Sequence, residues 1–174
     1  MENFGFIHGE LDTKILILYV LRRLPRPVDT DTLAYLCSFD NGVGWFDFAE
    51  CLADLVDTGH VEELSGSRYL ITDKGSTNGE AAETSLPYSV RVKADKLIAP
   101  VAERMRRDAM IGASHEPSSD GGVMVNLSLS DGKGEVMSMR LLAPDEETAD
   151  VMERAFRTDA EEIYQRITQI LTEG

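Results

Sequence analysis

Few side chains in this sequence have the types and the spacing that catalysis or metal binding requires. The three histidines and two cysteines include no i, i+4 histidine pair and no Cys-x-x-Cys unit that could hold a metal. Cys51 lies among acids on a predicted helix, and nearby acids raise the pKa of a thiol and make it a poor nucleophile. Ser114 and His115 are neighbours on a predicted strand and so point to opposite faces. We therefore expect no enzyme activity, no metal and no cofactor.

Carboxylates gather on one side of a helix that the pattern predicts over residues 44–58. At 100° per residue, the apolar side chains, including Trp45, Phe46 and Phe48, separate from a polar side. In a helix-turn-helix this polar side would enter the major groove of DNA. Here it lacks Lys and Arg, so it cannot neutralise phosphates, on which DNA affinity depends. The acids, which are candidate contacts for a basic protein partner, are Asp47, Glu50, Asp54 and Asp57, with Cys51 and Thr58 on the same side.

Basic residues cluster in two other parts of the chain. Residues 90–108 hold six Lys or Arg against three acids, and residues 22–26 hold three arginines. One interpretation is a surface that contacts phosphates, together with an arginine on a predicted hairpin. The other is a solvated helix face that pairs with the acidic helices of the same chain. The candidate nucleic-acid-binding residues are Arg22, Arg23, Arg26, Arg68, Arg91, Lys93, Arg104, Arg106 and Arg107.

Composition favours a folded, acidic, non-membrane protein. The chain has 174 residues, 43% of them hydrophobic, which is ample for a core. With 31 acids and 17 bases the net charge is −14, which repels phosphate and anionic membrane surfaces at long range. The longest strongly apolar run, residues 15–21, is far shorter than the ~20 residues of a membrane span. Because the N-terminus also lacks the basic start of a secretory signal, we expect a cytoplasmic protein.

The predicted elements of the first half are three helices followed by a hairpin. Capping residues and apolar spacing predict helices over about 12–24, 29–37 and 44–58, with a buried strand as the alternative for the first. Two strands are predicted over 61–64 and 69–72, and residues 73–75 are expected to close the unit. This order is typical of a winged helix-turn-helix.

The second half is predicted to be a small α+β domain. A linker over residues 81–89 leads to a helix over about 90–110, bent or restarted at Pro100. A strand is expected near 109–115, and alternating apolar residues predict an antiparallel hairpin between about 123 and 141. A last helix, 144–171, carries one apolar stripe, and the two long helices are expected to cover the sheet. The overall prediction is an α+β chain with a winged-helix domain (1–80), a linker and an α+β domain (90–174).

Two resemblances accompany this pattern. The wing of many bacterial regulators is similar to residues 58–75, TGHVEELSGSRYLITDKG, in its "tG" turn and its "yxlTxkG" ending. An uncharacterised bacterial family, catalogued as domain of unknown function 4364, resembles nearly the whole chain. The segments that carry this resemblance are FGFIHGELDTKILILYVLRRLP, WFDFAECLADLVDTGHV, SLPYSVRVKA, RRDAMI and SLSDGKGEVMSM. It implies the winged-helix start and brings no established activity.

Three functions remain open on these observations. The first is a winged-helix transcriptional regulator that binds double-stranded DNA as a homodimer. The second is an interaction adaptor on the same scaffold, whose acidic helix face meets a basic protein. The third is a small-molecule sensor with a pocket between the second-half hairpin and the long helices. The group Trp45, Phe46 and Phe48 is either core or an exposed anchor for a partner, and the last helix packs on its own sheet or against a second subunit.

Overall fold

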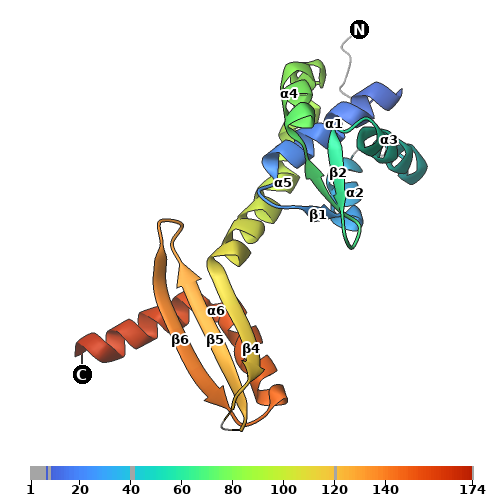
Figure 1. Ribbon diagram of the computed structural model, residues 1–174. Helices are drawn as coiled ribbons and strands as arrows, with labels where there is room; N and C mark the ends of the chain where they lie inside the picture. The colour runs from blue at the N-terminus through green and yellow to red at the C-terminus, as the bar shows by residue number, and fades with distance from the viewer. Residues whose placement is uncertain (1–6, 8, 40–41, 120, 174) are drawn as a thin grey trace. The chain divides into compact units, whose positions relative to one another are not determined.

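The computed structural model describes residues 7, 9–39, 42–119 and 121–173 of the chain (Figure 1). Contacts between residues divide the chain into two compact units, 1–105 and 106–174. Each unit has its own hydrophobic core. The two units are therefore described one at a time.

The first unit places three helices beside a small antiparallel sheet (Figure 1). The strands lie in the order β1-β3-β2, and the hairpin between β2 and β3 turns through Gly66 at a φ of +77°. The helices and the hairpin strands confirm the sequence prediction, whereas the two-residue strand β1 is too short to show a periodicity. The bounds are α1 (Gly9–Arg23), β1 (Val28–Asp29), α2 (Thr30–Cys37), α3 (Trp45–Asp57), β2 (Val61–Leu64) and β3 (Arg68–Ile71).

Helix α1 is the centre of the first core. Residues 15–21 are all buried, as expected for a segment that is apolar on every side. The helix packs against α2, α3 and the helix that follows the hairpin. Cys37, at the end of α2, lies in this core, and its burial raises the pKa of the thiol.

The prediction that residues 73–75 close the first unit was wrong, because a helix begins there. Helix α4 (Asp73–Ala82) is capped by Thr72, whose hydroxyl accepts from the Gly75 amide at 3.1 Å. A Cβ on Gly75 would lie only 2.0 Å from the backbone oxygen of His60. The absence of a side chain at Gly75 therefore allows α4 to pack closely against the backbone of His60.

The linker between the two halves was expected at residues 81–89, but the structure divides into its two units between residues 105 and 106. The turn η1 (Glu83–Ser85) leads into α5 (Tyr88–Met110), which runs through Pro100 as one helix instead of restarting there. Apolar residues between Leu86 and Ala102 recur at helical spacing and are buried in the first core. Most of α5 therefore belongs to the first unit, because its buried stripe continues that core.

The second unit is a three-stranded antiparallel sheet covered on one face by a long helix (Figure 1). The inward side chains at 123, 125, 127 and 129 are buried against Phe156 and its neighbours, which confirms the predicted alternation. The expectation that both long helices cover this sheet was wrong for α5, whose buried side chains lie in the first core. The bounds are β4 (Ile111–Pro117), β5 (Val123–Ser130), β6 (Glu135–Ala143) and α6 (Glu146–Glu173).

Helix α6 has two parts. Asp145 caps its start by accepting from the Thr148 amide at 2.8 Å. The backbone departs from helical geometry at Asp159, with φ −124° and ψ 26°. Before this kink the helix lies on the sheet, whereas residues 161–173 include no buried side chain. Two sheets and the helices beside them make the chain an α+β protein, as expected.

Candidate interaction surface around helix α3

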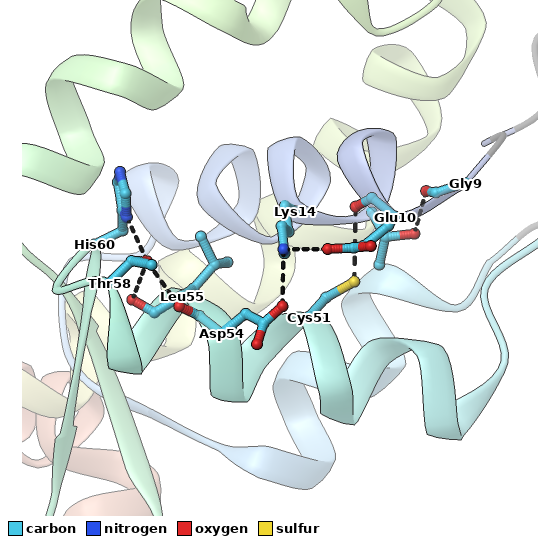
Figure 2. Close-up of polar contacts among 9 residues, drawn as sticks. Gly9, Glu10, Lys14, Cys51, Asp54, Leu55, Thr58 and His60 are labelled. Atoms are coloured by element: carbon cyan, nitrogen blue, oxygen red, sulfur yellow. Dashed lines mark hydrogen bonds and ion pairs between the residues drawn. The ribbon is translucent and has the colours of Figure 1, made fainter.

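One face of α3 holds the helix against α1. Phe48, Cys51, Leu52 and Leu55 are buried and follow the i, i+3, i+4, i+7 spacing of a helical stripe. The Cys51 thiol donates to the backbone oxygen of Glu10 over 3.6 Å (Figure 2). Burial raises the pKa of this thiol, which agrees with its position in the core.

The prediction that Cys51 lies on the solvent side of α3 was therefore wrong. A free cysteine behaves as a small apolar side chain and is among the most often buried residue types. The prediction placed Cys51 among the polar residues, and it therefore placed Phe46 on the apolar side of the helix. In the structure Cys51 lies inside, and Phe46 is 87% exposed.

The solvent side of α3 combines an aromatic, a small and two acidic side chains. Phe46 and Trp45 are exposed, whereas Phe48 is buried. The expected core position therefore holds for Phe48, and the expected exposure holds for Phe46 and Trp45. The acidic side that the sequence predicted is thus interrupted by apolar surface. We call the following four exposed residues the outer side of α3: Phe46, Glu50, Ala53 and Asp57.

Asp54 is engaged within the first unit. Lys14 Nζ lies 2.9 Å from Asp54 Oδ2 and also contacts the carboxylate of Glu10 (Figure 2). The hydrogen bonds to Glu10 and Asp54 hold the pKa of Lys14 above its ordinary value. Asp54 is therefore less available to a partner than the exposed acids of the same helix.

A polar chain fixes the C-terminal end of α3. The Thr58 hydroxyl donates to the backbone oxygen of Asp54 at 2.7 Å and lies 2.8 Å from His60 Nδ1 (Figure 2). The amide of Asn78 donates to His60 Nε2 at 2.8 Å, and burial and the charge of Lys74 lower the pKa of His60. The lowered pKa favours the neutral imidazole, and both of its ring nitrogens are engaged by neighbouring side chains.

Two hollows flank the outer side of α3. The first, of about 250 Å³, lies toward the start of α1 and is lined by the carboxylates of Glu10, Asp47 and Glu50. The second, of about 210 Å³, lies toward the hairpin and is bordered by Asp57 and Glu63. Both can receive a cationic side chain, and the second can also receive an apolar one. The floor of the second hollow consists of Ala49, Leu52, Ala53 and Val56.

The arginines at the end of α1 are held in ion pairs within the first unit. Arg22 Nη1 lies 2.7 Å from Glu83, and Arg23 contacts both Glu83 and Asp95 at 3.2 Å. Along α1, Arg22 lies eight residues beyond Lys14, which binds Asp54 of α3, and this is about 12 Å at a helical rise of about 1.5 Å per residue. These two arginines therefore do not join the surface around α3.

The remaining basic candidates do not join that surface as one group either. On α5, Arg91 lies over the ring of Tyr88 with a distance of 5.9 Å to the centroid. Arg107 binds Glu161 at 3.1 Å within the second unit, and Lys93 and Arg106 also have interactions. Three further candidates are exposed: Arg26, Arg104 and, at the hairpin turn, Arg68.

Sequence reasoning missed both hollows and the role of Lys14. Lys14 and Asp54 are 40 residues apart, so no local pattern marks their contact. In the part of the chain that the structure describes, no three carboxylate, thiol or imidazole groups gather as metal ligands would. None of the described helices has the length and apolarity to cross a membrane.

Comparison with known proteins adds a family. The family model for the Domain of unknown function (DUF4364) matches residues 13–171. The chain belongs to this family. No curated protein and no solved structure matches it. The DUF4364 match spans all of α3 and most of both units, so the surface around α3 lies within the family domain.

Proposed function

We propose that the first unit is a winged-helix domain that acts as a protein-interaction module and binds a basic segment of another protein on α3. The element order α1-β1-α2-α3-β2-β3 and the sheet order β1-β3-β2 support the winged-helix assignment. A fold of this kind can host unrelated functions, so the surface must indicate the ligand.

The observation that carries the proposal is the composition of the outer side of α3. It presents Phe46, 87% exposed, with Glu50 one turn and Asp57 three turns farther along the helix, and it includes no basic residue. An exposed aromatic ring is the kind of side chain that anchors protein interfaces. Carboxylates around it repel phosphate and attract lysine and arginine.

The spacing of the two hollows describes the partner. Glu50 lines the first hollow and Asp57 the second, and seven residues of helix separate them by about 10 Å. Two turns of a partner helix, or about three residues of an extended strand, span that distance. We therefore expect a segment with two cationic side chains at such a spacing and an apolar side chain between them.

A peptide titration tests the proposal. An amphipathic helical peptide with lysines on one face and leucines beside them is titrated against the labelled full chain at low and at physiological salt. Reversing Glu50 and Asp57 to lysine should weaken binding by about tenfold or more, because two attractive contacts become repulsive. The control reverses two exposed acids of the second unit, Glu135 and Glu146, and should leave binding unchanged. Equal loss in both variants would mean general charge attraction and would reject the proposal.

DNA binding is the second candidate function. It is favoured by the element order and by the exposed position of Arg68 at the hairpin turn, where a wing would meet a phosphate. Mixed-sequence duplex DNA in a gel-shift experiment at about 50 mM salt is the test, since phosphate contacts are strongest at low salt. Retardation that is lost in Arg68→Ala would favour DNA, and no retardation would reject it.

We also propose that the chain forms a homodimer through the end of α6. Ile170 and Leu171 are 71% and 78% exposed and follow the half-buried Ile163 and Ile167 at helical spacing. Isoleucine recurs here at steps of four and then three residues, which is the spacing of a helix face that packs on another helix.

A further inference from the structure

An apolar pocket lies in the first unit, away from the outer side of α3. It has a volume of about 430 Å³ and is bounded by α1, α4, η1 and the end of α3. Its walls differ from those of the two hollows, because they carry mainly aliphatic side chains. The apolar lining consists of Leu11, Ile15, Leu18, Leu55, Ala81 and Ala82.

Small residues of α4 create this space. A Cβ on Gly79 would lie 3.1 Å from Leu18 Cβ, so α4 and α1 are in close contact at that point. Ala81 and Ala82 come two and three residues later, and their short side chains leave room above Leu18 and Leu55. A pocket of a few hundred Å³ with apolar walls and few polar groups is typical of small-molecule sites.

The polar groups at the rim are uncharged or already neutralised. Lys14, the cation at this rim, is held by the carboxylates of Glu10 and Asp54, so an incoming anion gains little from it. His60 is neutral and uses both ring nitrogens in hydrogen bonds to its neighbours. The Thr84 hydroxyl and the amide oxygen of Asn78 are neutral groups that can bond to a ligand.

We propose that this pocket binds a neutral, mainly apolar small molecule that carries one hydrogen-bonding group. Aliphatic walls favour an apolar body because its transfer from water is favourable. A charged ligand would lose hydration without meeting an unpaired opposite charge. The inference goes beyond the proposed function, because it uses α1 and α4 and not the outer side of α3. Leu55 is the link between them, since it lines the pocket from the inner face of α3.

A matched pair of fluorescent probes tests the charge argument. Phenylnaphthylamine is neutral, with two apolar ring systems and one N–H group, and anilinonaphthalenesulfonate has the same ring systems plus a sulfonate. Titration of each into the full chain should show the neutral probe binding about tenfold more tightly or better. Equal affinity for the two probes, or no binding of the neutral one, would overturn the proposal.

A pocket-filling variant tests the location. Ala81 is exposed on α4, so Ala81→Phe can place its ring over the pocket without disturbing the core. It should weaken the neutral probe by about tenfold or more, whereas Ala155→Phe, at an exposed position of α6, should not. Circular dichroism confirms that both variants are folded. Unchanged affinity in Ala81→Phe, or equal loss in both variants, would overturn the assignment. A fall in molar mass with Ala81→Phe would also overturn the assignment, because it would show that a second copy of the chain fills the pocket of the natural protein.

Discussion

The guanidinium of Arg23 lies 3.4 Å from the centroid of the Tyr19 ring. The Tyr19 hydroxyl donates to Asp95 at 2.9 Å, and Arg23 contacts the same carboxylate. Together these groups tie α1 to α5 within the first unit. Burial, followed by the hydrogen bond to Asp95, raises the pKa of Tyr19 to about 12.

This pKa predicts a loss of stability at alkaline pH. A tyrosine in an unfolded chain titrates near pH 10, so the fold favours the protonated hydroxyl. The stabilisation is fully present below about pH 10 and is lost as the pH rises through about 12. A shift of this size corresponds to roughly 2–3 kcal/mol. Urea denaturation at a series of pH values from 9 toward 12 measures the free energy of unfolding. Its fall with rising pH should be smaller for Tyr19→Phe than for the natural chain.

Tyr35 is the matched control for this measurement. It is 62% exposed on α2, so Tyr35→Phe should keep the pH dependence of the natural chain. If Tyr19→Phe and Tyr35→Phe lost stability equally over this range, the raised pKa of Tyr19 would not be the cause.

Two phenylalanines of α3 should respond in opposite ways to truncation. Phe48 is fully buried, so Phe48→Ala should lower the free energy of unfolding by about 3–5 kcal/mol. Phe46 lies on the outer side, so Phe46→Ala should change it by less than about 0.5 kcal/mol and weaken binding of the basic peptide. Chemical denaturation and peptide titration of both variants provide the comparison. A large stability loss from Phe46→Ala would place this ring in a core instead.

Much of the first unit could be predicted from its residues, because local rules decide it. The cap at Asp29, the glycine of the hairpin turn and the apolar run of α1 each predict their element without distant contacts. The orientation of α3 could not be predicted in the same way. It depends on whether Cys51 packs on α1, where the thiol contacts the backbone oxygen of Glu10, 41 residues away in the sequence.

The boundary between the units was also hidden from sequence reasoning. The end of the first domain, expected at residue 80, falls within α4, where Gly75 and Gly79 pack against the backbone of His60 and the side chain of Leu18. For the basic residues, the interpretation that they pair with acids of the same chain holds for at least two of the arginines. Arg22 and Arg107 have partners in Glu83 and Glu161, which are distant in sequence. A count of charges along the chain cannot show such pairs.

The ion pairs of Glu83 should contribute to stability. Glu83→Gln removes the charge that Arg22 and Arg23 share, and all three side chains are partly buried. We expect the free energy of unfolding to fall by about 1–2 kcal/mol, between the values for surface and buried pairs. Glu80→Gln is the control, because Glu80 is exposed and lies 3.5 Å from Arg22. An equal effect of the two variants in urea denaturation would contradict a special role for Glu83.

The proposed homodimer can be tested at the end of α6. Ile170→Glu combined with Leu171→Glu should convert a dimer to a monomer, because the two aliphatic side chains that the dimer would bury become charged. Size-exclusion chromatography with light scattering gives the molar mass directly. Gln165→Glu with Thr172→Glu adds the same charges at exposed positions on the opposite side of the helix and should leave the dimer intact. A monomeric natural chain at all concentrations would reject the proposal.

Both sulfhydryl groups of the chain, at Cys37 and Cys51, lie in the interior of the first unit, and residues 106–174 contain none. An alkylating reagent can therefore reach a thiol only during transient opening of the first unit. Opening of the second unit exposes no thiol and causes no alkylation. The rate of alkylation in the native protein thus reports transient opening of the first unit independently of the second unit.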